Sequence, residues 1–162
     1  MKPAEPAPRW PIDWTDDRGQ VGGIEVLPFA ILIFVIGTLL IANAWAVVDA
    51  KLAVNAATRE SVRAFVEASS EVAGRERSER IARETLAGYG RNPAKLELAG
   101  PDYQHGGGFE RCNPVTIRAS YPVPALTIPI IGGFGEAFRV SSSHTEIVDP
   151  FRSGLAAGGG CR

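Results

Sequence analysis

One uninterrupted apolar run, VLPFAILIFVIGTLLIANAWAVV, occupies residues 26–48 of this 162-residue chain, between Glu25 and Asp49. No charged side chain lies between those two carboxylates. As a helix rising about 1.5 Å per residue, the run is roughly 35 Å long, whereas the hydrocarbon core of a bilayer is about 30 Å thick. The sequence therefore predicts one transmembrane helix over residues 26–48.

The chain before this helix is short and rich in proline. Residues 1–25 show no periodic apolar face, so we expect a disordered leader that includes Pro3, Pro6, Pro8 and Pro11. Basic residues do not set the orientation, because three lie on each side of the helix: Lys2, Arg9, Arg18, Lys51, Arg59 and Arg63. A short polar segment ahead of a larger folded part favours a cytoplasmic N-terminus and an extracytoplasmic C-terminal domain.

A cleaved secretory signal is the alternative to a retained helix. Ala42-Asn43-Ala44 and Ala44-Trp45-Ala46 both fit a small-x-small cleavage pattern, so a cut after Ala44 or Ala46 stays open. Apolar regions of signal peptides run roughly 7–15 residues, which is shorter than this run. The length therefore favours the transmembrane interpretation.

Two helices are predicted on the far side of the membrane. Residues 49–68 lack Gly and Pro, so the first helix should continue to Ala68. A helical repeat of 100° per residue places four apolar side chains on its packing stripe: Val48, Leu52, Val62 and Val66. The second helix covers residues 70–89, with Ser69 or Ser70 as N-cap and Gly88 or Gly90 near the C-cap. Its exposed face should carry two ion pairs, Glu76–Arg80 and Glu79–Arg83.

The pattern changes to strands after Gly90. We predict strands over Lys95–Ala99, Val115–Tyr121 and Phe138–Val148, the second with Val115, Ile117, Ala119 and Tyr121 facing inward. Three prolines interrupt the apolar segment Pro122–Phe134, which excludes an interior strand; it should pack near Val62–Val66 or reach a neighbouring protein. The fold class is therefore α+β: a long N-terminal transmembrane helix that continues as an amphipathic helix, a second helix and a small antiparallel sheet. The predicted parts are a leader (1–25), a transmembrane helix (26–48), an extracytoplasmic domain (49–152) and a flexible tail (153–162).

The composition indicates no catalytic chemistry. Seventeen basic and 18 acidic residues give a net charge of −1, which disfavours nucleic acid as a partner. Ser141–Ser143, His144 and Glu146 alternate along a strand, so they imply no catalytic geometry, and Gly106–Gly108 lacks the Lys-Ser/Thr of a phosphate loop. We therefore predict no catalytic residue, no cofactor and no metal ligand.

The two cysteines match no metal-binding pattern. If the C-terminal part is exported, Cys112 and Cys161 can form one disulfide, which would fasten the tail to the sheet. Two unpaired thiols are the alternative.

Residues 17–68 place an acidic residue at the edge of a long apolar helix that runs into a charged amphipathic half. Three segments are notable in this order: Asp17-Arg18-Gly19, Glu25-Val26-Leu27-Pro28 and Ala57-Thr58-Arg59-Glu60-Ser61-Val62-Arg63. In these segments the chain resembles the TadE-like pseudopilins of tight-adherence (Tad) pilus assembly. The remainder is similar in its pilin-like architecture alone.

The resemblance implies processing by a prepilin peptidase on the cytoplasmic side. A cut after Gly19 would make Glu25 the sixth mature residue, whereas a cut after Gln20 would make Val21 the first residue and Glu25 the fifth. In pilins this glutamate is thought to pair with the N-terminal amine of a neighbouring subunit, and a carboxylate at the membrane edge usually needs such a partner. Alternatively, Glu25 only marks and caps the start of the helix.

Two functions follow as hypotheses. The first is a minor pseudopilin or assembly subunit of a Tad-type pilus or secretion apparatus, whose partners are membrane lipid, other pilin and pseudopilin subunits and the Tad machinery. The second is a single-pass, membrane-anchored extracytoplasmic binding module whose ligand contacts the loops of residues 101–134.

Overall fold

The computed structural model describes residues 26–128, 130–135 and 138–158. The chain divides into two compact units, Met1–Leu40 and Ile41–Arg162. In chain order, the elements are helices α1 (Val26–Val66) and α2 (Glu71–Gly88), a short 3-10 helix η2 (Pro93–Lys95), and strands β1 (Glu97–Tyr103), β2 (Pro114–Val123), β3 (Leu126–Ile128), β4 (Gly132–Phe134) and β5 (Phe138–Ile147). The predicted α+β class, with a long apolar helix, a second helix and small antiparallel sheets, is confirmed.

Helix α1 is 41 residues long. Pro28 lies in its first turn, where a missing N–H group costs no helical hydrogen bond. The helix ends two residues before the predicted Ala68, whose amide donates to the Phe65 carbonyl oxygen at 3.1 Å. The sequence therefore predicted the extent of this helix closely.

The packing face of α1 differs from the predicted stripe. Val62 is fully buried and Val66 partly, but Val48 and Leu52 are 50% and 57% exposed. The buried face consists mainly of small side chains: Ala50, Ala53, Val54, Ala57, Thr58, Ser61, Val62, Ala64 and Phe65. Small side chains let neighbouring backbones approach closely, and a stripe chosen for bulky apolar residues alone misses them.

Helix α2 begins at the predicted cap. The Ser70 hydroxyl accepts a hydrogen bond from the Ala73 amide, and Gly90, with φ of 70°, follows the C-terminal turn. The Glu79–Arg83 pair forms at 2.8 Å, but Arg80 pairs with Glu84 at 3.8 Å rather than with Glu76. Both acidic neighbours of Arg80 are four residues away, so the spacing alone could not choose between them.

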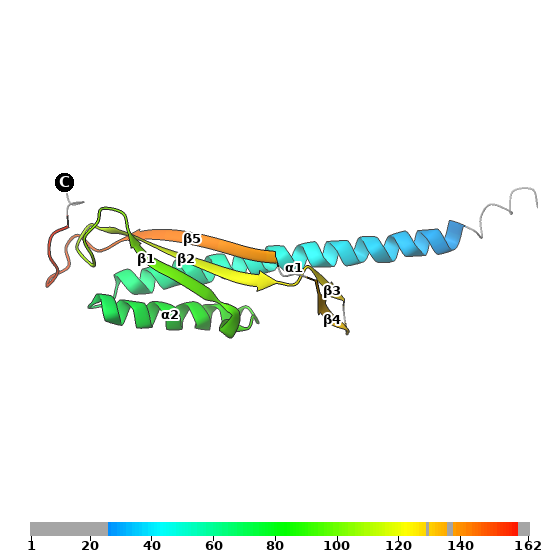
Figure 1. Ribbon diagram of the computed structural model, residues 1–162, viewed down its shortest axis with the longest axis horizontal. Coiled ribbons are helices and arrows are strands. Elements are labelled where there is room, and N and C mark those ends of the chain that lie inside the picture. Colours follow the sequence, from blue (N-terminus) through cyan, green and yellow to red (C-terminus); the bar gives the residue numbers. More distant parts are fainter. Residues whose placement is uncertain (1–25, 129, 136–137, 159–162) are drawn as a thin grey trace, which may run out of the picture. The chain divides into compact units, whose positions relative to one another are not determined.

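The larger sheet has the antiparallel order β1-β2-β5. Central strand β2 buries the four predicted residues, Val115, Ile117, Ala119 and Tyr121. Strand β1 starts two residues later than predicted and extends to Tyr103, because Lys95 belongs to η2, which Asn92 caps. The sheet runs beside α2 and the C-terminal part of α1 (Figure 1).

The core lies between one face of this sheet and the two helices. One cluster joins the alanine-rich part of α1 to Leu86 of α2, Tyr121 of β2 and Val140 of β5. A second cluster joins Val62 and Phe65 of α1 to β2 and Val148. The Phe65 ring meets the Phe109 ring edge-on, with centroids 5.4 Å apart. Since the core uses α1 only from Val47 onward, the preceding turns contribute nothing to either cluster.

The segment Pro122–Phe134 departs from its prediction in two ways. Pro122 belongs to β2, which at this point pairs with β5 alone, and a proline is tolerated where one side of a strand is unpaired. The following residues form a two-stranded sheet, β3–β4, in which Leu126 pairs with Phe134 and Ile128 with Gly132. We call the described residues of this segment, 124–128 and 130–135, the β3–β4 hairpin. The hairpin is hydrogen-bonded to α1 at Asn43, well before Val62–Val66 in the helix, so it does not contact α1 at the predicted place.

Candidate functional site

The first candidate surface is the N-terminal part of α1. Its large apolar side chains are about half exposed or more: Val26, Leu27, Phe29, Ile31, Leu32, Ile33, Phe34, Val35, Ile36 and Leu40. Thr38 carries the one hydroxyl group in residues 26–40. It donates to the Phe34 carbonyl oxygen at 2.8 Å, so it remains hydrogen-bonded without water. Among the described residues, α1 is the one helix long and apolar enough to cross a membrane. Lipid or a protein partner must cover such a surface.

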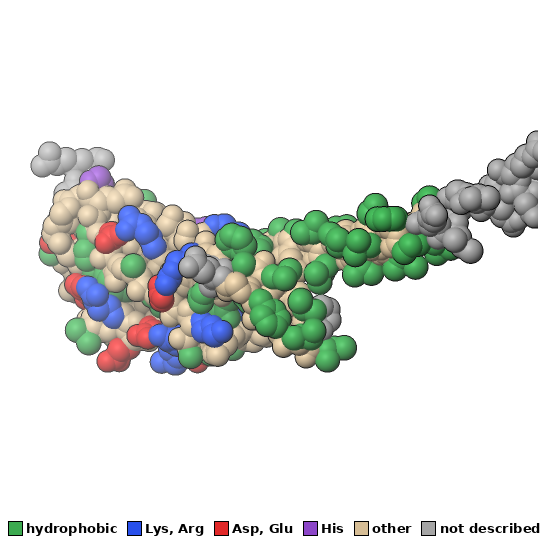
Figure 2. Space-filling model, turned by 45° about the vertical axis from the view of Figure 1, so that its right-hand side comes forward, with side chains coloured by type: hydrophobic (Ala, Val, Ile, Leu, Met, Phe, Trp, Pro, Cys, Tyr) green, Lys and Arg blue, Asp and Glu red, His purple; other side chains and the backbone are tan. Residues whose placement is uncertain are grey.

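The second candidate surface is the β3–β4 hairpin. Ile130, Ile131 and Phe134 are exposed, and Ile130 is as accessible as in an extended chain, at 107%. The hairpin carries no charged residue, and the nearest charges in the sequence are Arg118 and Glu136. Figure 2 shows the apolar side chains that gather on this part of the molecule. A soluble monomer rarely exposes so much contiguous apolar surface.

Asn43 connects the hairpin to α1. Its side-chain NH₂ donates to the Thr127 carbonyl oxygen at 3.2 Å, and its Oδ1 accepts from the Thr127 amide. One amide side chain thus satisfies both backbone groups of Thr127 on strand β3. This pair of hydrogen bonds fixes the hairpin beside the last turns of the apolar run.

The first charges after the apolar run are also paired. Asp49 accepts a hydrogen bond from the Arg91 guanidinium at 2.5 Å, and the same nitrogen lies 3.2 Å from the Ala46 carbonyl oxygen. Two residues further along α1, the Lys51 ammonium donates to the Ser141 carbonyl oxygen of β5. A hollow of about 430 Å³ lies here, lined by Val48, Lys51 and Arg139 among others. These contacts form a polar belt (Asp49, Lys51, Arg91) at the end of the apolar run.

The serines and the histidine of β5 do not form a nucleophile–base pair with each other. Ser142 and His144 lie on the same face of the strand, and both contact Asn55 of α1, at 3.0 and 2.7 Å from its Oδ1. Both side chains therefore donate to one acceptor and help to seat β5 on α1. Among the described residues, no group of three His, Cys, Asp or Glu side chains could hold a metal ion.

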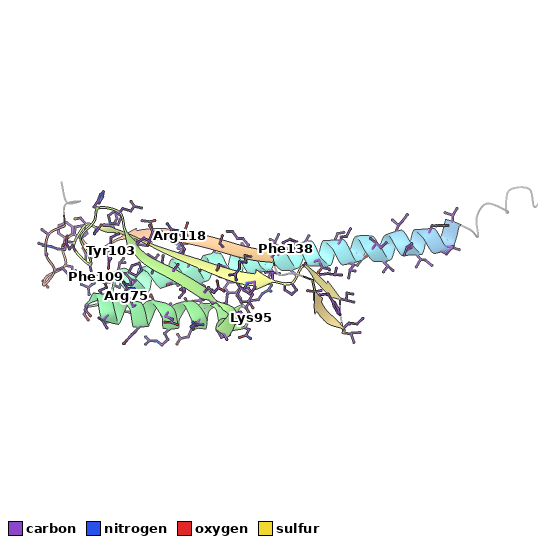
Figure 3. All side chains as sticks on the ribbon, in the orientation of Figure 1. Arg75, Lys95, Tyr103, Phe109, Arg118 and Phe138 are labelled. Carbon is purple, nitrogen blue, oxygen red and sulfur yellow. The ribbon has the colours of Figure 1, made fainter. Side chains whose placement is uncertain are left out.

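Clear physical causes account for shifted pKa values at Tyr103, Glu97 and Arg139 in the folded domain. Burial, and then the nearby Glu71 carboxylate, raise the pKa of Tyr103 to about 12. Figure 3 places Tyr103 at the same end of the domain as Arg75 and Phe109. The hydrogen bond from Arg139 lowers the pKa of Glu97, and in return raises the pKa of Arg139.

Most of the predicted site residues lie outside the described part of the chain. Gly19, Gln20, Val21 and Glu25 precede residue 26, so the structure does not test processing or the role of the glutamate. Cys161 follows residue 158 and is likewise outside. These assignments stay predictions.

Cys112 and the segment before Cys161 are nevertheless close. The Arg111 amide donates to the Ala156 carbonyl oxygen at 3.1 Å, and the Gly158 amide donates to the Arg111 carbonyl oxygen at 3.1 Å. Residues 156–158 of the predicted flexible tail are thus bonded to the neighbour of Cys112, and Leu155 packs against the second core cluster. No cysteine in the described part of the chain is free. This placement favours the predicted Cys112–Cys161 disulfide.

No family model, curated protein or solved structure matches the chain. The candidate surfaces must therefore be interpreted from their own chemistry. Sequence reasoning missed Asn43, whose signal was available: it is the one amide side chain within the apolar run. It also missed the pairing of Asp49 with Arg91, since the two residues are 42 positions apart.

Proposed function

We propose that this chain is a single-pass membrane protein that acts as a TadE-like minor pseudopilin, an assembly subunit of a Tad-type pilus or secretion apparatus. Its N-terminus is cytoplasmic and residues 49–152 are extracytoplasmic. It acts through helix-mediated packing against other pilin and pseudopilin subunits and has no catalytic role.

The observation that carries this proposal is that the first part of α1 is exposed and the second part is buried in the folded domain. The helix exposes large apolar side chains in its N-terminal part, and from Ala50 onward it supplies a buried face to a small α+β domain. A helix that serves only as a membrane anchor has no need to continue as the central element of the folded domain. A subunit that packs by its helix needs the anchor and the domain to be one continuous element, and 41 residues of unbroken α1 provide it.

The orientation is tested by fusing alkaline phosphatase to the C-terminus, because this enzyme is active only after export. We expect high phosphatase activity in cells that express the fusion. A second fusion after Asp17, which precedes the apolar run, is the control and should be inactive. An inactive C-terminal fusion, made in normal amount, would contradict the proposed topology.

The assembly role is tested at Glu25 in a strain with a working Tad apparatus. Glu25→Ala should leave the domain folded but lower the amount of pilus, because the carboxylate at the membrane edge has its expected partner on another chain. Asp13→Ala, an acidic residue ahead of the apolar run and away from the expected cleavage site, is the matched control and should leave the pilus level unchanged. Equal pilus levels in wild type and Glu25→Ala would exclude the assembly role of Glu25.

N-terminal sequencing of the membrane-extracted protein separates the processing alternatives. A new terminus at Gln20 or Val21 identifies a prepilin peptidase cut, whereas a terminus after Ala44 or Ala46 identifies a secretory signal and would overturn the proposal. Recovery of the chain in a filament fraction supports a subunit role. A detergent-soluble monomer without pilus-machinery partners supports the membrane-anchored binding module, whose loops at residues 101–134 include most of the exposed β3–β4 hairpin.

A further inference from the structure

The β3–β4 hairpin has a composition that its own folding does not require. No charged residue occurs from Ala119 to Gly135, and the turn between β3 and β4 presents Ile130 and Ile131 outward. Ile130 has φ of 75°, a left-handed conformation that a β-branched residue rarely adopts. Glycine or asparagine would suit this position better, so turn geometry does not explain the bulky apolar side chain.

The hairpin is attached to α1 at a defined position along the helix axis. Both backbone groups of Thr127 are bonded to Asn43, six residues before Asp49. At about 1.5 Å per residue, this contact lies roughly 9 Å along the helix from the first charged side chain after the apolar run. The hairpin is therefore fixed beside α1 on the apolar side of the polar belt.

The polar belt itself gives the level of a water–lipid boundary. The Asp49 carboxylate and the Arg91 guanidinium pair with each other, and Arg91 also bonds the Ala46 carbonyl oxygen. Beyond these residues the surface carries mixed charges, as Figure 2 shows. Charged groups favour the headgroup region, and the apolar side chains on the other side of the belt favour the hydrocarbon.

We propose that the β3–β4 hairpin inserts its apolar turn into the outer leaflet beside α1, so that the domain contacts the bilayer at a second point. The occupant of this surface is lipid: the hairpin exposes Ile130, Ile131 and Phe134, and α1 exposes Ile41 and Trp45 on either side of the Asn43 contact. This inference rests on the proposed function, which places residues 26–48 in the membrane. A second contact restrains the tilt and rotation of the domain on its helix.

Fluorescence quenching by brominated lipid tests the inference in the full chain. Trp10 and Trp14 are replaced by Phe, which leaves Trp45 as the one native tryptophan. Ile131→Trp adds a reporter on the hairpin. Phe151→Trp adds the matched control, because Phe151 is 92% exposed and its neighbour Arg152 bonds the Val66 carbonyl oxygen at the far end of α1. Each protein is placed singly in nanodiscs of phosphatidylcholine and phosphatidylglycerol, with bromine near the top of the acyl chains.

We expect bromolipid to remove most of the fluorescence that Ile131→Trp adds and none of the fluorescence that Phe151→Trp adds. Equal, weak quenching of both added signals, with Trp45 strongly quenched, would overturn the hairpin insertion while the membrane anchor stands. Absence of Trp45 quenching would instead overturn the anchor and the hairpin insertion with it. A second copy of the chain could cover the hairpin instead of lipid. In that case iodide would fail to quench the Ile131→Trp signal only in vesicles crowded with the protein, and bromolipid would not quench it at all. This result would also overturn the inference.

Discussion

Both parts of α1 contain many apolar side chains, yet the two parts use them in opposite ways. Before Asp49 the helix carries Phe, Ile, Leu and Val on every side and leaves them exposed, whereas from Ala50 onward it buries mainly Ala, Ser and Thr against the sheet and α2. A hydrophobic side chain is thus no measure of burial within the folded chain. In this domain, the buried side chains of α1 are mainly small ones on its packing face. The bulky apolar side chains are exposed, and they form the surface that we propose contacts lipid.

The sharpest test of this contrast compares two phenylalanines of α1. Phe65 is fully buried, so Phe65→Ala should lower the free energy of unfolding of the domain by about 3–5 kcal/mol through lost burial and the cavity left behind. Phe34→Ala, in the exposed part, should leave the domain unchanged. Urea unfolding of the full chain in detergent micelles measures both. Equal losses would show that the two parts of α1 are not energetically distinct.

A second comparison enlarges an alanine in each part. Ala57 is fully buried, so Ala57→Leu should destabilise the domain by about 1–3 kcal/mol, because the surrounding side chains must move to admit the added carbons. Ala42 is exposed, and Ala42→Leu should leave the melting temperature unchanged. If Ala57→Leu proves neutral, the face is packed more loosely than the structure indicates.

A third prediction concerns the link between α1 and the hairpin. Asn43→Ala removes both hydrogen bonds to Thr127, each with a net value of about 0.5–1.5 kcal/mol, so the hairpin should open more often. Hydrogen exchange at the Thr127 amide should become about tenfold faster or more, while exchange in β2 stays the same. Faster exchange throughout the sheet would mean that Asn43 supports the whole domain rather than the hairpin alone.

The smallest effect is expected from Tyr103, which packs on the second core cluster beside Phe65 and Val62. Its pKa is raised to about 12, from an ordinary value of about 10, because burial disfavours the phenolate. A raised folded-state pKa contributes stability that is fully present below pH of about 10 and is lost as the pH rises through about 12. The ultraviolet titration of wild type minus that of Tyr103→Phe should have its midpoint near 12. A midpoint near 10 would show that this end of the core is open to water.

The sequence predicted those features that depend on local periodicity. The apolar run defined most of α1, Ser70 marked the start of α2, and the alternation from Val115 to Tyr121 identified the buried face of β2. Each of these signals is contained within a few turns or one strand. Local pattern was therefore sufficient for the fold class.

The remaining features depend on contacts between distant residues. The predicted packing face of α1 was wrong at Val48 and Leu52, because the sheet packs against the side of the helix that carries alanines. The sequence of the helix alone does not indicate which side the sheet covers. Asn43 and Thr127 are 84 positions apart, so their pairing could not be read from either segment. The same holds for Asn55, which draws Ser142 and His144 of β5 onto α1.

The contacts at Asn43 and Asp49 also constrain the length of the chain between them. Successive residues of an α-helix are rotated by about 100°, so one inserted residue between these two positions would turn Asn43 away from Thr127 whenever Asp49 faced Arg91. The two contacts therefore share a fixed rotational phase. An insertion ahead of Ile41 keeps that phase, because both contacts follow it in the chain. Length variation should accordingly be tolerated in the first turns of α1 and rejected between residues 43 and 49.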